Sequence, residues 1–186
     1  MRLTGGLDRG RRLKAPKGLG TRPTAAKVRE AIFNILGPPP EGAVLDLFAG
    51  TGALGIEALS RGAPKGVFVE RDRGALLSLR QNLRTFGFED RATVISTDAV
   101  TALRRLATSL TREERFGWVF MDPPYALPTE GILGELCDKS LVQPWAVIVV
   151  EHDRKHRPPS SVGCLIRTDH RTYGDTELSF FRAGCS

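Results

Sequence analysis

The residues best suited to chemistry in this sequence form the run Asp122-Pro123-Pro124-Tyr125. The two prolines lack backbone N–H donors and have a fixed φ, so they predict a stiff loop whose carbonyl groups, including that of Pro123, can accept hydrogen bonds. The carboxylate of Asp122 is a further acceptor, and the ring of Tyr125 can stack on a planar ligand. This set fits a planar ring with an exocyclic amine, because it offers two acceptors for two N–H protons. The alternative is a structural proline turn with a capping Asp and a packed Tyr.

The chemistry that this run favours is transfer of a group to the amine nitrogen. An aromatic amine is a weak nucleophile because its lone pair is delocalised into the ring. Accepting both N–H bonds at Asp122 and the Pro123 carbonyl would favour a pyramidal nitrogen and stabilise the positive charge that develops on it. We therefore predict that all four residues of the run are catalytic, with Asp122 accepting or relaying the proton. Such a displacement requires no metal, and we expect none.

The second candidate motif is a glycine turn within residues 43–55, which read A-V-L-D-L-F-A-G-T-G-A-L-G. A short apolar run breaks into Gly50, Gly52 and Gly55 before apolar residues resume at helical spacing, which predicts a buried strand, a turn and a helix start. Glycines let the backbone bend tightly and approach a ligand, and the N–H groups of the first helical turn face it. The spacing also fits the dinucleotide fingerprint, so it does not separate a dehydrogenase from a methyltransferase.

Asp46, which lies inside the predicted strand, separates these two possibilities. A buried carboxylate is costly unless it is paired or hydrogen-bonded. The ammonium and sulfonium groups of S-adenosylmethionine could serve as its partner, directly or through the glycine turn, whereas a pyrophosphate would be repelled. Asp46 therefore favours S-adenosylmethionine as the ligand.

Acidic residues also lie at or just beyond the carboxyl ends of three successive predicted strands, namely Glu70, Asp98 and Asp122. Ligands bind outside these ends in a doubly wound sheet, and Glu70 stands about 20 residues after the first glycine, where an acid would hold a ribose. For Asp98 alone, an N-cap of the next helix is the better interpretation. Together, beside a glycine turn, the three acids predict a shared pocket.

Strands and helices alternate after residue 43, which predicts an α/β fold with a largely parallel sheet. A final strand pair is predicted around the turn Tyr173-Gly174-Asp175. The predicted strands cover residues 43–48, 67–70, 92–96, 118–121, 145–150, 164–170 and 176–182, and the helices between them cover residues 74–85, 100–110 and 132–138.

The positive charge of the chain lies in its N-terminal part. Nine of the 27 Lys and Arg residues, but only two of the 21 Asp and Glu residues, lie in the first 36 positions. This distribution is typical of a polyanion-binding extension, although a solvated basic tail is the alternative. We expect residues 1–20 to form an irregular or hairpin-like arm outside the core, followed by a helix with Thr24 as its N-cap. The predicted division is a basic extension at 1–40 and a catalytic domain at 41–186.

The composition suits one globular domain of 186 residues. No apolar run approaches the roughly 20 residues that span a bilayer, and we expect a cytoplasmic protein. Cys137, Cys164 and Cys185 are odd in number and lack zinc-ligand spacing, so we interpret them as buried or incidental thiols.

At these motifs the sequence resembles the RsmD-type 16S ribosomal RNA guanine-N2 methyltransferases, a class I S-adenosylmethionine-dependent family. The resemblance covers nearly the whole chain. Its most particular parts are Arg22-Pro23-Thr24 and the continuation A-L-G-I-E-A-L-S-R at 53–61, whereas the glycine turn and D-P-P-Y occur in many amino-methyltransferases. The N-terminal arm, with Leu3-Thr4-Gly5-Gly6, departs from the family pattern.

The resemblance implies a Rossmann-like, seven-stranded, mostly parallel sheet with an antiparallel C-terminal strand. It implies S-adenosylmethionine as methyl donor and a guanine of 16S rRNA in the small ribosomal subunit as acceptor, with the base turned out of its loop. Residues 122–125 would grip the guanine. The implied cofactor-binding residues are Asp46, Phe48, Ala49, Gly50, Thr51, Gly52, Glu70, Arg71, Asp98 and Ala99, and the implied RNA-binding residues are Arg9, Arg11, Arg12, Lys14, Arg22, Thr24, Arg29 and Asn34.

Three other functions remain open on the sequence. The first is an amino-methyltransferase that acts on DNA adenine N6 or on protein glutamine, the second is a non-catalytic RNA-binding protein with a relict cofactor pocket, and the third is a dehydrogenase. Two short motifs, Glu151-His152 and Tyr173-Gly174, have no assigned role.

Overall fold

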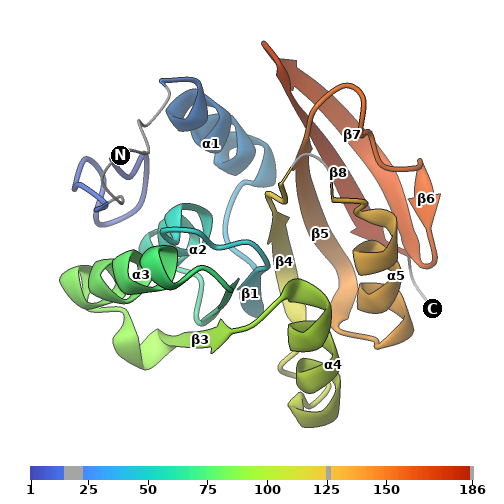
Figure 1. The fold of residues 1–186 in the computed structure, drawn as a ribbon, viewed down its shortest axis with the longest axis horizontal. Helices are drawn as coiled ribbons and strands as arrows, with labels where there is room; N and C mark the ends of the chain where they lie inside the picture. The colour runs from blue at the N-terminus through green and yellow to red at the C-terminus, as the bar shows by residue number, and fades with distance from the viewer. Residues whose placement is uncertain (15–22, 125–126, 185–186) are drawn as a thin grey trace.

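A computed structural model describes residues 1–14, 23–124 and 127–184, without the side chains of 23–25. In this part of the chain an eight-stranded sheet runs in the order β3-β2-β1-β4-β5-β8-β7-β6 (Figure 1). The helices are α1 (Pro23–Leu36), α2 (Ala53–Ser60), α3 (Arg73–Phe86), α4 (Ala99–Ser109) and α5 (Glu130–Asp138), with a 3-10 turn at Glu89–Arg91. The strands are β1 (Ala43–Asp46), β2 (Gly66–Glu70), β3 (Ala92–Ser96), β4 (Phe116–Met121), β5 (Val142–His152), β6 (Ser161–Val162), β7 (Leu165–Tyr173) and β8 (Thr176–Ala183).

Helices cover both faces of the sheet. Apolar side chains of α1, α2 and α3 pack on one face, and those of α4 and α5 pack on the other. In β1, for example, Val44 belongs to the first cluster and Leu45 to the second. Burial on both faces explains why the central strands read as continuous apolar runs. The predicted α/β fold is confirmed.

The five strands from β3 to β5 are parallel, and β8, β7 and β6 complete the sheet through antiparallel pairs. Seven strands were expected, and the eighth is the short edge strand Ser161–Val162, which lies in a stretch without any sequence motif. The predicted hairpin of the last two long strands is confirmed.

The strand boundaries differ most at β5, which begins three residues before the predicted start at Trp145 and ends two residues after the predicted end at Val150. The pairing with β4 shifts register between Phe116 and Trp118, and Trp145 adopts a positive φ of 65° at this irregularity. Pro144 lies beside it. A proline inside a strand argues against strand structure unless a bulge accommodates it, and for this reason the sequence pattern placed the start too late.

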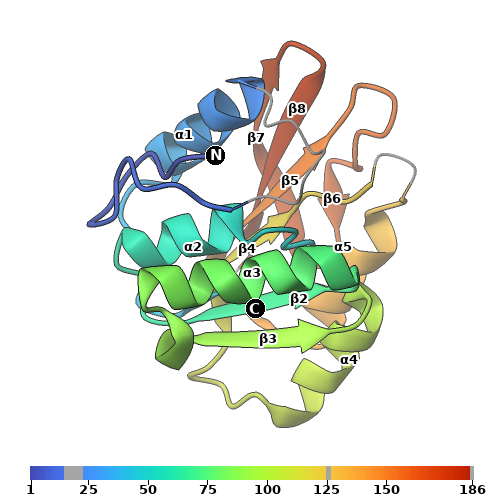
Figure 2. The ribbon, with the colours of Figure 1, turned by 60° about the vertical axis from the view of Figure 1, so that its left-hand side comes forward.

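The N-terminal arm is hairpin-like, with an antiparallel bridge between Arg2 and Arg12, but it belongs to the core (Figure 2). Leu3 and Leu13 are 2% and 4% exposed and pack in the same cluster as α1, α2 and α3. The prediction of an arm outside the core was therefore wrong. Two apolar residues ten positions apart on a polar, glycine-rich segment carried too little signal to show that both point inward.

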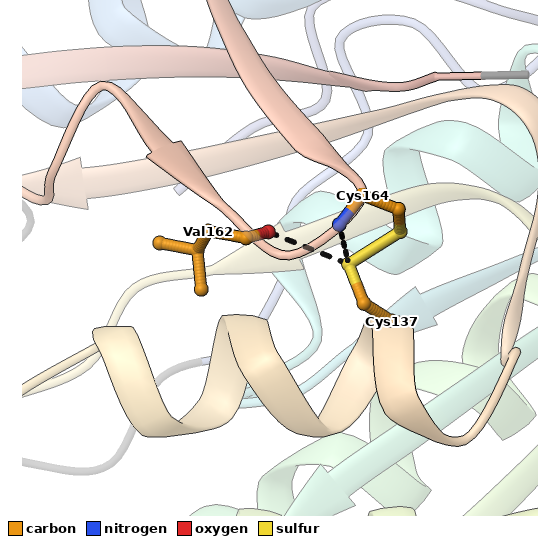
Figure 3. The surroundings of a disulfide bond; sticks show 3 residues. All are labelled: Cys137, Val162 and Cys164. Atoms are coloured by element: carbon orange, nitrogen blue, oxygen red, sulfur yellow. Dashed lines mark hydrogen bonds between the residues drawn. A yellow bond between two sulfur atoms is a disulfide. The ribbon is translucent and has the colours of Figure 1, made fainter.

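Cys137 in α5 and Cys164 before β7 form a disulfide, with their Cα atoms 5.6 Å apart (Figure 3). The backbone N–H of Cys164 also lies 3.1 Å from the Cys137 sulfur. The interpretation of these two residues as thiols was wrong, because their proximity arises from the packing of α5 beside β6 and not from their spacing. Cys185 lies outside the described residues.

None of the helices in residues 23–124 and 127–184 is long and apolar enough to cross a membrane.

Candidate functional site

The glycine turn connects β1 to α2 at the carboxyl edge of the sheet. Gly50 and Gly52 have φ values of 53° and 85°, in the left-handed region that favours glycine. Gly55 is required for a different reason, because a Cβ at this position would overlap the ring of Phe68 on β2. The third glycine therefore lets α2 pack closely on the sheet, while the first two shape the turn.

Asp46 lies beneath this turn. Its side chain is 2% exposed, and its Oδ2 accepts a hydrogen bond from the backbone N–H of Gly55 at 3.0 Å. Burial raises the pKa of Asp46 to about 7; the negative charges of Asp122 and Glu70 act in the same direction, and the Gly55 hydrogen bond opposes them. Of the two routes considered for Asp46, the geometry favours support of the turn over direct contact with a ligand.

Glu70 ties the glycine turn to the end of β2. Its Oε2 accepts a hydrogen bond from Gly50 N–H at 2.8 Å, and its Oε1 accepts from the N–H groups of Arg71 and Asp72 at 2.7 and 2.8 Å. A carboxylate oxygen has two lone pairs, so Glu70 can still accept bonds from a ligand hydroxyl.

Asp98 caps α4 and also faces the pocket. Its side chain accepts a hydrogen bond from Thr101 N–H at 2.9 Å, which holds the pKa of Asp98 below its usual value. The cap interpretation is confirmed, and it does not exclude a ligand contact because the residue is exposed.

A cavity of about 850 Å³ opens along the carboxyl ends of the strands, within the size range of small-molecule sites. The predicted site residues that line it are Phe48, Gly50, Glu70, Arg71, Asp98, Ala99, Asp122, Pro123 and Pro124. Ala49, Thr51 and Gly52 do not line it and, like Asp46, support the turn. Tyr125 lies outside the described residues.

The cavity has a second wall that the sequence analysis missed. Leu127 and Pro128 line it just before α5, Gly131 and Ile132 line it from the first turn of α5, and Glu151 lines it from β5. The α5 residues gave only an ordinary helical pattern. Glu151 did carry a usable signal, since it stands near the end of the fifth strand, as the three predicted acids do on theirs.

Asp122 and Glu151 lie on neighbouring strands. Met121 and Val150 are partners in the parallel pairing of β4 and β5, so the two acids, which each come one residue later, lie at the same height along the sheet. Asp122 is exposed to the open cavity but enclosed by protein on its other sides, and this desolvation raises its pKa to about 6. Burial, and next the charge of Asp122, raise the pKa of Glu151 to about 8.

The cavity is electronegative. Its charged lining residues among those described are Glu70, Asp98, Asp122 and Glu151 against a single base, Arg71. Desolvation raises the pKa values of Asp122 and Glu151, and the charge of Asp122 raises that of Glu151 further, so a cationic ligand would stabilise the ionised forms of both acids. The donor and acceptor set therefore suits a ligand with a sulfonium and an ammonium group.

The predicted RNA-binding residues divide into four groups, of which buried Arg29 is the last. Arg9, Arg12, Lys14 and Asn34 are exposed and available to a partner. Arg11 is partly occupied, because its guanidinium lies 4.5 Å from the centre of the Phe86 ring, pairs with Asp8 and donates to the Thr85 carbonyl. Arg22 and the side chain of Thr24 lie outside the described residues, although α1 begins at Pro23 and so includes Thr24, which is therefore not its N-cap.

Arg29, which the family resemblance implied as an RNA contact, is instead buried. Arg29 is 3% exposed, and its Nε donates to Glu57 Oε2 at 2.8 Å. Its Nη2 donates to the carbonyl of Arg2 in the arm. Arg29 precedes Ile32 and Phe33 on the inward side of α1, and its partner Glu57 is 28 residues away, so helical spacing alone could not reveal the pair.

His152, the neighbour of Glu151, belongs to a buried polar network. Its Nε2 bonds Ser179 Oγ at 2.8 Å, and Glu177 nearby accepts from Arg157 at 2.8 Å and from His170 at 3.0 Å. Burial works against ionisation of Glu177, but the bonds from His170 and Arg157 prevail and lower its pKa to about 2. The two histidines and Glu177 could reach a common metal ion, but Arg157 already balances the carboxylate. This network gives His152 a structural role.

Comparison with known proteins places this site in a family. Residues 1–182 match the family described as "Conserved hypothetical protein 95". The chain is 43% identical over 184 residues to "Putative rRNA methyltransferase YlbH" of Bacillus subtilis, covering 98% of both proteins. It is 37% identical over 165 residues to "Ribosomal RNA small subunit methyltransferase D" of Escherichia coli, covering 86% of this chain and 78% of the relative. Among solved structures, "Putative methyltransferase yhhF from Escherichia coli" superposes with a TM-score of 0.84 at 32% identity, covering 100% of this chain and 99% of that one.

Proposed function

The chain belongs to the family described as Conserved hypothetical protein 95 and is an S-adenosylmethionine-dependent methyltransferase, and from this premise we propose that it methylates the exocyclic N2 amine of a guanine in 16S ribosomal RNA. One observation carries the proposal. Asp122, Pro123 and Pro124 line the same cavity as Glu70 and Asp98, so an acceptor pair for an amine faces the cofactor residues. The names of the two relatives, "Putative rRNA methyltransferase YlbH" and "Ribosomal RNA small subunit methyltransferase D", support the choice of RNA.

The residues present fit the cofactor. Glu70 and Asp98 would accept hydrogen bonds from the ribose and adenine ends, and the backbone at Phe48 and Gly50 would border the methionine end. The acidic lining favours the positive charges of the cofactor. When bound, S-adenosylmethionine supplies an electrophilic methyl group on sulfur.

The acceptor residues determine how the amine is held. Asp122 and the Pro123 carbonyl would accept its two N–H bonds, which directs the nitrogen lone pair away from the ring and stabilises positive charge on the nitrogen. Pro123 is buried and the backbone of the prolines is stiff, so this acceptor pair is preorganised before the base arrives. Tyr125 would stack on the base.

The RNA contacts would come from the arm and α1. Arg9, Arg12 and Lys14 are exposed on the arm, and Asn34 is exposed on α1. The arm is anchored by hydrogen bonds from Leu7 N–H to the Ser60 carbonyl at 3.0 Å and from Lys14 N–H to Asn82 Oδ1 at 2.8 Å. A fixed arm presents its charges in one geometry, which suits a substrate with a folded shape, such as an assembled or assembling small subunit in the cytoplasm.

The substrate class can be tested with one panel of acceptors. Purified protein and S-adenosylmethionine with a labelled methyl group are incubated with small ribosomal subunits from a strain that lacks the modification, with duplex DNA, and with a ribosomal protein fraction. We expect label in the RNA of the subunits alone. Label in DNA would support the adenine-N6 alternative, label in protein the glutamine alternative, and no transfer despite cofactor binding would support a non-catalytic RNA-binding protein.

A further inference from the structure

Glu151 is an acid in the cavity that the mechanism above does not use. It stands near the end of β5, one position after Val150, whose partner Met121 precedes Asp122 on β4. Both acids line the cavity. Among the described residues, neither carboxyl group accepts a hydrogen bond from a protein donor, although Asp46, Glu70 and Asp98 all do.

The surroundings of Glu151 leave Asp122 as its main charged neighbour. On the other side of β5, Glu151 pairs with the apolar Leu178 of β8, and Glu177 beyond it is neutralised by Arg157 and His170. The wall from α5 contributes Gly131 and Ile132, which carry no charge. Elsewhere in the cavity lie Glu70, Asp98 and the exposed Arg71, and Asp46 lies beneath the turn, while His152 follows Glu151 but bonds Ser179. No described base pairs with either acid.

We propose that Glu151 is a second catalytic residue of the methyl transfer, and that together with Asp122 it accepts the proton that the target amine loses. This inference rests on the proposed function. The proposal rests on two neighbouring carboxyl groups in one cavity that accept no hydrogen bond from the residues that the structure describes. A residue kept only for structure would be expected to have a partner, because an acid enclosed by protein is costly without one.

The step balances as follows. The lone pair of the amine nitrogen forms a bond to the methyl carbon, and the methyl–sulfur bond breaks with its electron pair remaining on sulfur. The nitrogen thereby becomes positively charged, and one of its protons passes to the carboxyl pair. The product is a methylated amine, a neutral thioether and one additional proton on Asp122 or Glu151.

The change of charge in the cavity during the reaction favours transfer of this proton from the amine to the carboxyl pair. A positive sulfonium beside two carboxylates stabilises their ionised forms, so the pair is ready to accept a proton when the donor is bound. The sulfur is neutral after transfer. Without the sulfonium charge the affinity of the two carboxylates for a proton rises, and the positively charged amine beside them is the group that supplies it. Burial, and for Glu151 also the charge of Asp122, raises the pKa values of the two acids to about 6 and about 8, which agrees with this behaviour.

The test compares Glu151→Gln with the wild type. The substitution keeps the shape of the side chain and removes its proton-accepting group. We expect a moderate loss of affinity for S-adenosylmethionine, because one of the two carboxylates that attract its sulfonium is gone. At saturating cofactor, kcat should fall about 100-fold, the low end for general acid–base catalysis, because Asp122 remains. A matched control is Glu130→Gln, an exposed acid at the start of α5 that does not line the cavity, and it should keep wild-type kcat.

The pH profile of kcat/KM for S-adenosylmethionine distinguishes a catalytic role of Glu151 from a structural one, because this ratio reports ionisations of the enzyme before the cofactor binds. The protonated pair is inactive, so the wild type should gain activity up to a midpoint near 8, the pKa raised by burial and by Asp122. In Glu151→Gln only the ionisation of Asp122 is left, and the midpoint should fall to about 6. An unchanged kcat, or a reduced kcat with an unchanged midpoint, would overturn the role of Glu151.

A binding experiment separates this inference from the proposed substrate. Calorimetric titration of S-adenosylmethionine near pH 7.5, in buffers of different ionisation enthalpy, should show net proton release from the wild type but not from Glu151→Gln. The product S-adenosylhomocysteine, which keeps its ammonium group but lacks the sulfonium charge, should release none from either. Proton release with no transfer to ribosomal RNA would contradict the proposed function alone, whereas equal release from both proteins would contradict the role of Glu151.

Discussion

Substitution of Glu57 by Gln would test how the arm is held to the core. Glu57 is fully buried, and it accepts bonds from Arg29 Nε at 2.8 Å, Arg61 Nη2 at 3.0 Å and Thr4 N–H at 3.0 Å. Without the carboxylate, the guanidinium of Arg29 stays buried with no opposite charge. Removing one partner of a buried ion pair costs about 3–5 kcal/mol in free energy of unfolding. The amide can still accept some of these bonds, so we expect about 3 kcal/mol.

This loss is measurable as a shift in the melting temperature. For a chain of this size, 1 kcal/mol corresponds to roughly 2–4 °C, so the variant should melt about 6–12 °C lower. The double variant Arg29→Met with Glu57→Gln removes both charges and should recover part of the loss. A matched control pair is Arg84→Met with Glu89→Gln, because that exposed ion pair should contribute at most about 1 kcal/mol.

Two results would refute the reasoning. The first is a Glu57→Gln variant that melts at the wild-type temperature, which would mean that the network does not stabilise the arm. The second is a double variant whose loss equals the sum of the single losses. If the double variant folded well but bound RNA with a smaller salt dependence, Arg29 would contact RNA after all.

Three further outcomes are expected. Asp122→Ala should abolish methyl transfer and leave the affinity for S-adenosylmethionine within a few-fold of wild type, because no described backbone group of the glycine turn bonds Asp122. If isothermal titration showed that cofactor binding was lost together with transfer, the role of Asp122 as amine acceptor would be contradicted. Replacing Arg9, Arg12 and Lys14 by Gln should lower the magnitude of the slope of log K against log salt by up to about 2, at roughly 0.7 per phosphate contact, and an unchanged slope would mean that these three residues do not contact RNA. Because the pKa of Glu177 is lowered to about 2, its ion pairs stabilise the fold fully above pH 4.5 and are lost as the pH falls towards 2. In urea unfolding, Glu177→Gln should therefore be less stable than wild type at pH 6 and nearly as stable at pH 2.

The sequence was sufficient for features that depend on local pattern. The apolar run at residues 43–48 and the three glycines after it predicted a buried strand, a turn and a helix, and the structure confirms them. The acids Glu70, Asp98 and Asp122 were predicted to share a pocket, and all three line one cavity. Strand ends of a parallel sheet meet at one edge, so this prediction needed only the order of elements.

The sequence was insufficient where a residue depends on a distant partner. Arg29 looked like a surface base until Glu57 was placed beside it, and Cys137 meets Cys164 only through the packing of α5 against β6. The sequence singled out Asp46 as a residue of the site. Whether it contacts the ligand or supports the glycine turn became clear only from its hydrogen bond with the Gly55 N–H. Glu151 is a different case from these residues. It stands near the carboxyl end of a predicted strand, as Glu70, Asp98 and Asp122 do, so the same argument would have identified it.

The account depends most directly on the identity of the methylated nucleoside. Small subunits from a strain that lacks the modification are incubated with the protein and S-adenosylmethionine, and their 16S RNA is digested and analysed by mass spectrometry. We predict N2-methylguanosine at a single position with the wild type and none with Asp122→Ala. A methyl group on any other base, or on guanine at an atom other than N2, would contradict the claim that Asp122 and Pro123 hold the guanine amine.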